Sequence, residues 1–213
     1  MHILRCTIMK ITLLFFLLFS AAAFQNFART EPVFRYETAS TITVYIQPLG
    51  SVDAENIDVI VNSLKSFYGC KVVVNTPATL TNDLLAKSRT RYEASKILKK
   101  FNSNKNLLII TQQDIACKNT ERNIDEWGVF GLGYRPGTTC VVSTFRLNRK
   151  NPSHSLQLFN ERLAKVSLHE IGHNLGLPHC TSGTDCLMND AKGSIKTVDN
   201  EKMILCSNCK KQL

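Results

Sequence analysis

Residues 169–179 read HEIGHNLGLPH, and this stretch predicts more of the structure than any other. Positions four apart on an α-helix share a face, so His169 and His173 can present ring nitrogens to one zinc ion. Gly176 can take the left-handed conformation that ends a helix, and the chain can then return with His179 as a third ligand. Three protein ligands leave one coordination position open, which is typical of a catalytic zinc.

Glu170 stands beside the coordination position that the three histidines leave open. A carboxylate there can take a proton from zinc-bound water, whose pKa falls to about 7, and can later protonate a leaving amine. The short pattern HExxH recurs by chance, whereas HExxHxxGxxH fixes five positions. The sequence therefore predicts hydrolysis by a metal-activated water, with Glu170 as general base and then general acid.

Four cysteines close behind the histidines indicate a second metal site. Cys180 directly follows the third histidine, Cys186 and Met188 form a Cys-x-Met, and Cys206 and Cys209 form a CxxC. Four thiolates suit a tetrahedral, purely structural zinc that is closed to solvent. The segment is too short to hold its shape by hydrophobic burial alone, so a metal would supply the missing stability. In an exported chain, Cys206 and Cys209 could instead form a redox pair or a small disulfide loop.

These motifs resemble those of the archaemetzincins, a family of zinc metallopeptidases in the metzincin clan. The family pattern is HExxHxxGxxHC, a short gap, CxM, seventeen residues and CxxC. The matching positions are His169, Glu170, His173, Gly176, His179, Cys180, Cys186, Met188, Cys206 and Cys209. One departure is the gap at residues 181–185, which has five residues where the family has four. A loop absorbs one extra residue at little cost.

The resemblance extends over roughly residues 105–209 and implies both the chemistry and the metals. It implies a hydrolase with two zinc ions per chain, one catalytic and one structural, that acts on a peptide or protein substrate. Met188 is implied to lie in a tight turn beneath the histidines, as an apolar floor that does not bind the metal. The glycine-rich segment around Gly131 is implied to be an edge strand, to which an extended peptide can add through main-chain hydrogen bonds.

The rest of the chain predicts an α/β fold. Apolar runs and period-two alternation predict strands, and near-helical apolar spacing predicts helices. Strands are expected at residues 41–47, 71–75, 106–111, 128–132 and 139–145, and helices at residues 54–68, at residues 81–101 and from Asn151-Pro152 through His173. This alternation favours a largely parallel sheet with helices on its faces. The resemblance implies a metzincin-type two-lobed domain, with a twisted mixed β-sheet flanked by helices, a long active-site helix and a small zinc-stapled C-terminal lobe.

The beginning of the chain is typical of a signal peptide. Arg5 and Lys10 precede an apolar stretch, and small residues follow at 20–23. The apolar stretch, residues 11–24, has 14 residues, short of the roughly 20 needed to cross a bilayer, so no stable membrane insertion is expected after cleavage. We predict export to the periplasm or secretion. The predicted organisation is a signal peptide at 1–23, an N-terminal extension at 24–39 and an archaemetzincin-like catalytic domain at 40–213.

Three further cysteines, Cys70, Cys117 and Cys140, lie outside the proposed zinc site. Two arrangements are open. One is a disulfide between Cys117 and Cys140, which leaves a third thiol free. The other is three reduced thiols buried as small apolar residues.

The basic composition does not indicate a nucleic-acid partner. The formal net charge is +9, but the positive residues are scattered in pairs such as Lys99-Lys100 and Lys210-Lys211. Such pairs are usually solvated, and no basic stripe interleaved with aromatic residues is present. A length of 213 residues suits one medium-sized domain.

Two alternatives to a peptidase stay open. One is a zinc-stabilised binding module without catalysis, although the intact Glu170 argues against it. The other is an amidase that applies the same metal chemistry to a cell-wall peptide. The motifs specify neither an oligomeric state nor a choice between internal and amino-terminal cleavage, which depends on an acidic residue able to capture a free amine.

Overall fold

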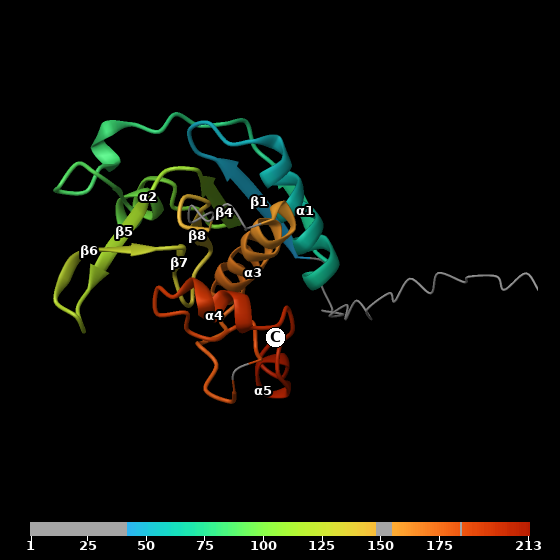
Figure 1. Cartoon of the computed structure of the whole chain (residues 1–213). Coiled ribbons are helices and arrows are strands. Elements are labelled where there is room, and N and C mark those ends of the chain that lie inside the picture. The colour runs from blue at the N-terminus through green and yellow to red at the C-terminus, as the bar shows by residue number, and fades with distance from the viewer. Residues whose placement is uncertain (1–41, 148–154, 184) are drawn as a thin grey trace, which may run out of the picture. The chain divides into compact units, whose positions relative to one another are not determined.

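A computed structural model describes residues 42–147, 155–183 and 185–213, all of which fall in one compact unit (Figure 1). The predicted signal peptide and N-terminal extension lie outside these residues. The elements, in chain order, are β1 (Thr43–Pro48), α1 (Ala54–Tyr68), β2 (Lys71–Val74), the 3-10 helix η1 (Asn82–Leu84), β3 (Tyr92–Glu93), α2 (Ala94–Lys100), β4 (Asn106–Thr111), β5 (Ile115–Asn119), β6 (Ile124–Val129), β7 (Gly131–Gly133), β8 (Thr139–Ser143), α3 (Leu156–Asn174), α4 (Ile195–Asn200) and α5 (Ser207–Lys210).

The larger sheet has five strands in the order β2-β1-β4-β8-β7. The first four strands are parallel, and β7 pairs antiparallel with β8 at the edge. The central strand β4 reads NLLIIT and is buried along nearly its whole length, as a parallel strand covered on both faces must be. The predicted parallel sheet and the predicted edge strand near Gly131 are both confirmed.

Helices cover both faces of this sheet, and β4 shows how the two cores are divided. Leu108 and Ile110 pack into a core with α1 and α3, whereas Leu107 and Ile109 pack into a second core with α2. The alternation follows from the two-residue period of a strand. In Figure 1, α1 and α3 lie side by side, and the two helices are in contact. The predicted α/β class, a mixed sheet flanked by helices, is confirmed.

A smaller sheet of three strands, in the order β3-β5-β6, was not predicted. The expected single strand at 128–132 is wrong, because the chain leaves the small sheet after Val129 and joins the large sheet at Gly131. Phe130 lies between them, and its carbonyl accepts a hydrogen bond from the Ser143 N–H at 2.8 Å. Strand β6 reads IDEWGV, which shows neither a clear alternation nor an apolar run.

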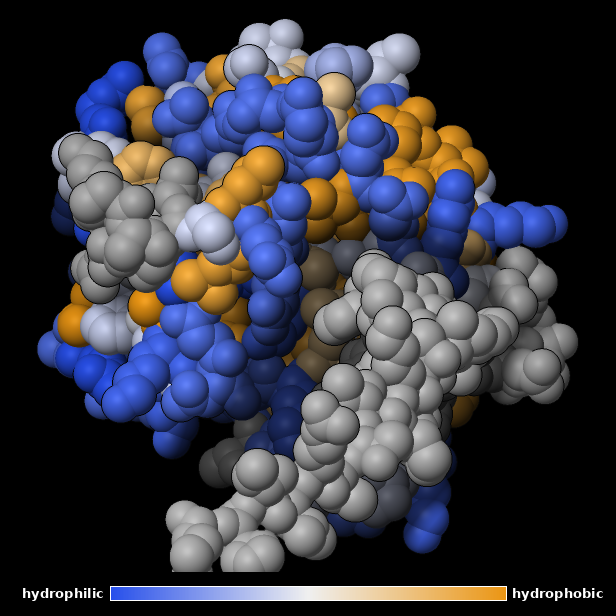
Figure 2. All heavy atoms as spheres, turned by 45° about the vertical axis from the view of Figure 1, so that its right-hand side comes forward, coloured by the Kyte–Doolittle hydropathy of each residue, from blue (hydrophilic) through white to orange (hydrophobic). Residues whose placement is uncertain are grey.

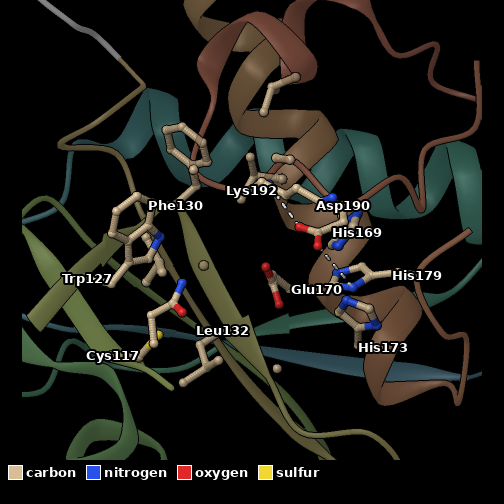
Figure 3. Close-up of a pocket in the computed structure, with 18 of the residues that line it drawn as sticks. Cys117, Trp127, Phe130, Leu132, His169, Glu170, His173, His179, Asp190 and Lys192 are labelled. Carbon is tan, nitrogen blue, oxygen red and sulfur yellow. Dashed lines mark hydrogen bonds and ion pairs between the residues drawn. The ribbon is translucent and has the colours of Figure 1, made fainter. Parts of the chain in front are cut away.

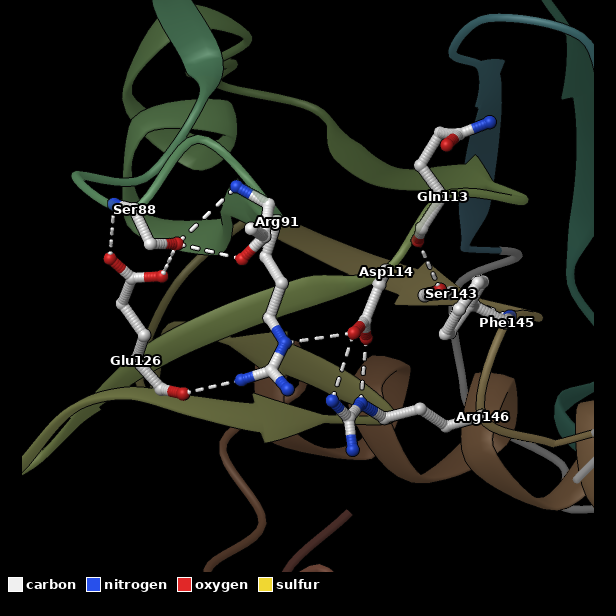
Figure 4. A network of polar contacts seen from close by, with 9 residues as sticks. Ser88, Arg91, Gln113, Asp114, Glu126, Ser143, Phe145 and Arg146 are labelled. Atoms are coloured by element: carbon white, nitrogen blue, oxygen red, sulfur yellow. Dashed lines mark hydrogen bonds and ion pairs between the residues drawn. The ribbon is translucent and has the colours of Figure 1, made fainter.

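Partly buried ion pairs hold the small sheet in place (Figure 4). Asp114, whose side chain is 12% exposed, accepts hydrogen bonds from Arg91 at 2.9 Å and from two nitrogens of Arg146 at 2.7 and 2.9 Å. Arg91 also donates to the main-chain carbonyl of Glu126 in β6 at 2.8 Å. Charge-assisted pairs of this geometry are stronger than neutral hydrogen bonds. They connect the segment before β3, the start of β5, β6 and the segment after β8.

The predicted helix at 81–101 is largely wrong. Its two ends form η1 and α2, but the middle is a turn followed by the short strand β3. Residues 87–91 read KSRTR and offer no apolar face for a helix to bury. Arg89 has a positive φ of 60°, which an α-helix cannot accommodate. By contrast, the predicted helix at 54–68 coincides with α1.

Helix α3 begins at Leu156, with Ser155 as its N-cap, because the Ser155 hydroxyl accepts a hydrogen bond from the Leu158 N–H at 3.2 Å. The predicted start at Asn151-Pro152 is therefore wrong, and that dipeptide itself lies outside the described residues. Serine is favoured at the N-cap because its hydroxyl can accept a hydrogen bond from a main-chain N–H of the first helical turn. Within the described ranges, none of the helices has the length and apolarity that crossing a membrane requires.

The chain after α3 has little regular structure and is attached to α3 by a partly buried ion pair. Arg162, 2% exposed, donates to both carboxylate oxygens of Asp199 at 2.6 and 2.8 Å.

On the face of the molecule drawn in Figure 2, hydrophilic residues surround smaller groups of hydrophobic ones.

The three cysteines outside the motifs are free thiols. The suggested disulfide between Cys117 and Cys140 is wrong, because Cys117 lies in β5 of the small sheet and Cys140 in β8 of the large one. Cys70 and Cys140 are buried, and burial raises the pKa of the Cys140 thiol well above its usual value. The alternative of three reduced thiols is the arrangement in the structure, except that Cys117 is only partly buried.

Candidate metal centres

Three histidines converge at the end of α3 (Figure 3). His169 and His173 lie on one face of the helix, which ends at Asn174. Gly176 follows with a positive φ of 100°, and the chain turns back to His179. The ligand nitrogens of the three rings lie within 4.8 Å of one another, and the ring centroids are 4.6 to 5.4 Å apart. The structure thus brings together the three side chains predicted to hold one zinc.

Main-chain carbonyls set the tautomer of two of these rings. His169 Nδ1 lies 2.8 Å from the carbonyl oxygen of Leu187, and His173 Nδ1 lies 2.8 Å from that of Leu177. A carbonyl can only accept, so Nδ1 carries the proton and Nε2 keeps its lone pair for a metal. Burial, with the neighbouring His173 second, lowers the pKa of His169 to about 3, and burial also lowers the pKa of His173. Both rings are therefore neutral at pH 7, as metal ligands must be.

Glu170 points into the space between the histidines and the edge strand (Figure 3). The strand approaches it closely: a Cβ on Gly131 would lie 2.6 Å from Glu170 Oε1, and one on Gly133 would lie 3.1 Å from Oε2. The glycines of β7 therefore make room for the carboxylate. Burial raises the pKa of Glu170 to about 8, and a bound cation would favour its ionised form.

Met188 is fully buried beneath the histidine-bearing turn of α3. A Cβ on Gly172 would lie 2.6 Å from Met188 Sδ and 3.1 Å from the Tyr68 hydroxyl, which donates to the carbonyl of Leu168 at 2.8 Å. Gly172, between the first two histidines, is thus the residue that lets the methionine pack against the helix. This contact matches the floor position implied for Met188.

The histidines open into a cleft of about 530 Å³. Helix α3 carries the histidine side of this cleft, and β7 with the β5–β6 hairpin forms the opposite side (Figure 3). Trp127 of the hairpin lies against Gly193 of the C-terminal segment, where a Cβ would be 2.9 Å from Trp127 Cζ2. The hairpin therefore contacts the C-terminal segment at this point.

The four cysteines of the motif form a second cluster, with all sulfurs within 4.8 Å of one another. The Sγ atoms of Cys180 and Cys206 are 3.6 Å apart, and those of Cys186 and Cys209 are 3.7 Å apart. A tetrahedron with Zn–S bonds of about 2.3 Å has S–S edges of about 3.8 Å, whereas a disulfide needs about 2.05 Å. The spacing therefore fits a thiolate-bound zinc, and Cys206 and Cys209 are both free thiols rather than the suggested disulfide.

The cysteine cluster is shielded from solvent to different degrees at its four ligands. Among the cysteines, Cys186 and Cys209 are buried and Cys180 and Cys206 are partly buried. The main-chain N–H groups of Ser182 and Cys206 lie 3.3 and 3.4 Å from the sulfurs of Cys180 and Cys186. These amides support thiolate charge, and the cluster offers four ligands with no open position.

Several residues that shape the site were not predicted from the sequence. The carbonyls of Leu177 and Leu187 carry no signal in a side-chain motif. Asp190 lies 3.9 Å from His179 Nδ1, and it also accepts a hydrogen bond from the Lys192 N–H at 2.8 Å. Glu201 lines the same cleft although it lies far along the chain from the histidines.

Comparisons with known proteins agree with this geometry. The model of the family described as "Peptidase family M54" matches residues 41–213. The archaemetzincin of Halobacterium salinarum is 32% identical over 176 residues, which cover 79% of this chain and 97% of that protein. The archaemetzincin of Archaeoglobus fulgidus is 32% identical over 166 residues, covering 78% and 95%.

Solved structures agree as well. The crystal structure of the Archaeoglobus fulgidus archaemetzincin has a TM-score of 0.69 and 31% identity, and the match covers 81% of this chain and all of that one. That of the Methanopyrus kandleri archaemetzincin has a TM-score of 0.66 at 24% identity, over 82% of this chain and 94% of that one, and shows the same fold.

Proposed function

The chain belongs to the archaemetzincins, peptidase family M54, and we propose that it hydrolyses peptide bonds with a zinc ion held by His169, His173 and His179. Membership of this family of zinc metallopeptidases supports a hydrolase. The observation that carries the proposal is the convergence of three imidazoles beside Glu170 in an open cleft. Zinc bound there would polarise the scissile carbonyl and lower the pKa of the attacking water.

Glu170 has the position that a general base needs. Its carboxylate lies in the cleft beside the histidines, where it can accept a proton from the attacking water and pass it to the leaving amine nitrogen. The close approach of Gly131 leaves the carboxylate little freedom to turn away. A general base held in place contributes about 10²–10⁴-fold to the rate.

The edge strand β7 suits an extended peptide substrate. One side of β7 pairs with β8, and Gly131, Leu132 and Gly133 all line the cleft on the other. The free main-chain groups of an edge strand can pair with an added strand. A peptide bound in this way would pass directly in front of Glu170 and the histidines.

A second, structural zinc on Cys180, Cys186, Cys206 and Cys209 completes the proposal. Its support is the sulfur spacing, which suits four thiolates around one ion. We also propose that residues 1–23 direct export and are removed, with support from Arg5, Lys10 and the apolar stretch that follows them.

The decisive test is the Glu170→Gln variant of the zinc-loaded protein. We expect both zinc sites to remain filled while cleavage of a peptide library falls by about 10³-fold, because the amide cannot accept the proton. Metal analysis and a fluorogenic peptide assay measure the two effects. Wild-type protein that holds zinc but cleaves no peptide would contradict the proposal. Peptidoglycan fragments in the same assay test the amidase alternative, and retained partner binding by an inactive protein would support the binding module.

A further inference from the structure

Glu201 is a buried carboxylate that nothing in the chemistry described above employs. The residue is 4% exposed, lines the same cleft as the histidines and lies directly after α4. Its Oε2 atom is buried without a hydrogen-bond partner within the described residues. A buried polar atom without a partner is costly and calls for an explanation.

The nearby cations do not satisfy this oxygen. Lys165 acts electrostatically on Glu201, but its ammonium group already contacts Glu161 Oε1 at 2.6 Å and the carbonyls of Val198 and Asp199 at 3.0 and 3.4 Å. An ammonium group has three N–H donors, so these three acceptors use them all. Burial, only partly opposed by Lys165, raises the pKa of Glu201 to about 8.

Three apolar residues line the cleft together with Glu201. Val198 belongs to α4, three residues before Glu201, and its carbonyl accepts from Lys165, the neighbour of Val166 on α3. Val166 lies one helical turn before Glu170 and shares its face of the helix. Phe130 lines the cleft from the opposite side. Val166, Val198 and Phe130 thus line the same cleft as Glu201 and Glu170 and offer apolar surface to a bound side chain.

We propose that Glu201 forms the end of a substrate subsite that takes a lysine or arginine side chain next to the scissile bond. The alkyl stem of such a side chain lies against Val166, Val198 and Phe130, and its cationic head pairs with the Glu201 carboxylate. Long basic side chains commonly bury the stem along apolar surface and place the charge at a polar partner. The subsite rests on the proposed peptidase function and adds a substrate preference to it.

The test is a comparison of peptides that differ at one position beside the scissile bond. Each position on either side of the bond carries lysine, arginine, acetyl-lysine or norleucine in turn, and the zinc-loaded full chain is assayed. At one position, peptides with lysine or arginine should have a kcat/KM at least about tenfold higher than the norleucine peptide. A hydrogen bond to a charged group contributes a free energy large enough for this ratio. In Glu201→Gln the ratio of lysine to norleucine should fall to about one.

A matched control is Glu55→Gln, which removes an exposed carboxylate on α1, outside the cleft, and should keep the preference. Equal rates for lysine, acetyl-lysine and norleucine in the wild type would overturn the subsite, whether or not Glu201→Gln folds. A basic preference that survives in Glu201→Gln would also overturn it.

A binding measurement separates this subsite from the peptidase proposal. Calorimetry with the zinc-loaded Glu170→Ala variant compares lysine and norleucine peptides without turnover. We expect about tenfold tighter binding of the lysine peptide, lost in the Glu170→Ala, Glu201→Gln double variant. If the wild type cleaves no peptide, the peptidase proposal fails, but this binding ratio still supports or overturns the subsite.

Discussion

The histidine and cysteine clusters adjoin in the chain, at His179 and Cys180, yet they are built in opposite ways. Two histidines stand on α3, which packs into the core with α1 and the large sheet, and their orientation follows from that packing. The cysteines lie in a segment with short helices and long irregular stretches. The fold therefore makes the histidine site, whereas the cysteine site must help to make its own part of the fold.

Hydrogen bonds make the first cluster depend on the second. The carbonyl of Leu187, between Cys186 and Met188, orients His169, and the Leu187 N–H donates to Ile204 at 2.8 Å. The Cys180 N–H donates to the carbonyl of Met188 at 2.7 Å. A metal that holds the cysteines together therefore also places an acceptor for a catalytic ligand.

The largest effect is expected for Cys206→Ser, which removes a thiolate ligand from the cysteine cluster. The C-terminal segment should lose its metal and its order, with a fall of more than about 4 kcal/mol in the free energy of unfolding. Because Leu187 then no longer orients His169, the histidine site should also bind zinc more weakly. Metal analysis and thermal unfolding measure both effects. A stable variant that keeps full zinc affinity at the histidines would break the proposed dependence.

His173→Ala should have the opposite pattern. The protein should lose the histidine-bound zinc and all peptidase activity but keep the cysteine-bound zinc. Its free energy of unfolding should change by less than about 2 kcal/mol. Metal analysis with circular dichroism checks this. Collapse of the fold on loss of this ligand would show that the histidine site is as structural as the cysteine site.

A smaller effect is expected for Gly131→Ala, which tests the sheet side of the cleft. The new Cβ would lie 2.6 Å from Glu170 Oε1 and should push the carboxylate out of place. We expect kcat to fall by about 10–100-fold with zinc content unchanged. Gly133→Ala, where the corresponding distance is 3.1 Å, should lose less activity. Equal, unimpaired turnover in both variants would show that β7 does not position Glu170.

The smallest effect is expected for Asp190→Asn. Asp190 lies 3.9 Å from His179, and both side chains are more than 40% exposed, so solvent weakens the interaction. Zinc affinity at the histidine site should fall by about three- to tenfold, as measured by competition with a chelator. A loss of a hundredfold or more would mean that Asp190 orients His179 far more strongly than its exposure suggests.

The elements predicted well are those with a continuous local pattern. The helix at 54–68 and the strand at 106–111 were predicted with the observed bounds because their apolar residues repeat without interruption. The small sheet was missed, because β5 and β6 are held by pairing with each other and by the Asp114 ion pairs, none of which a local pattern reveals. The thiols of Cys117 and Cys140 were open to pairing in the sequence and are kept apart by belonging to different sheets.

The sequence by itself determined the two sets of metal-ligand candidates, the position of Glu170 beside the histidines and the family, because these depend on residue type and on spacing along a helix and a turn. Tertiary structure decided which ring nitrogen faces the metal, how closely Gly131 approaches Glu170 and that Glu201 is buried in the same cleft. These features depend on main-chain carbonyls and on side chains far apart in the sequence, whose positions are set only when the sheet, α3 and the C-terminal segment pack together.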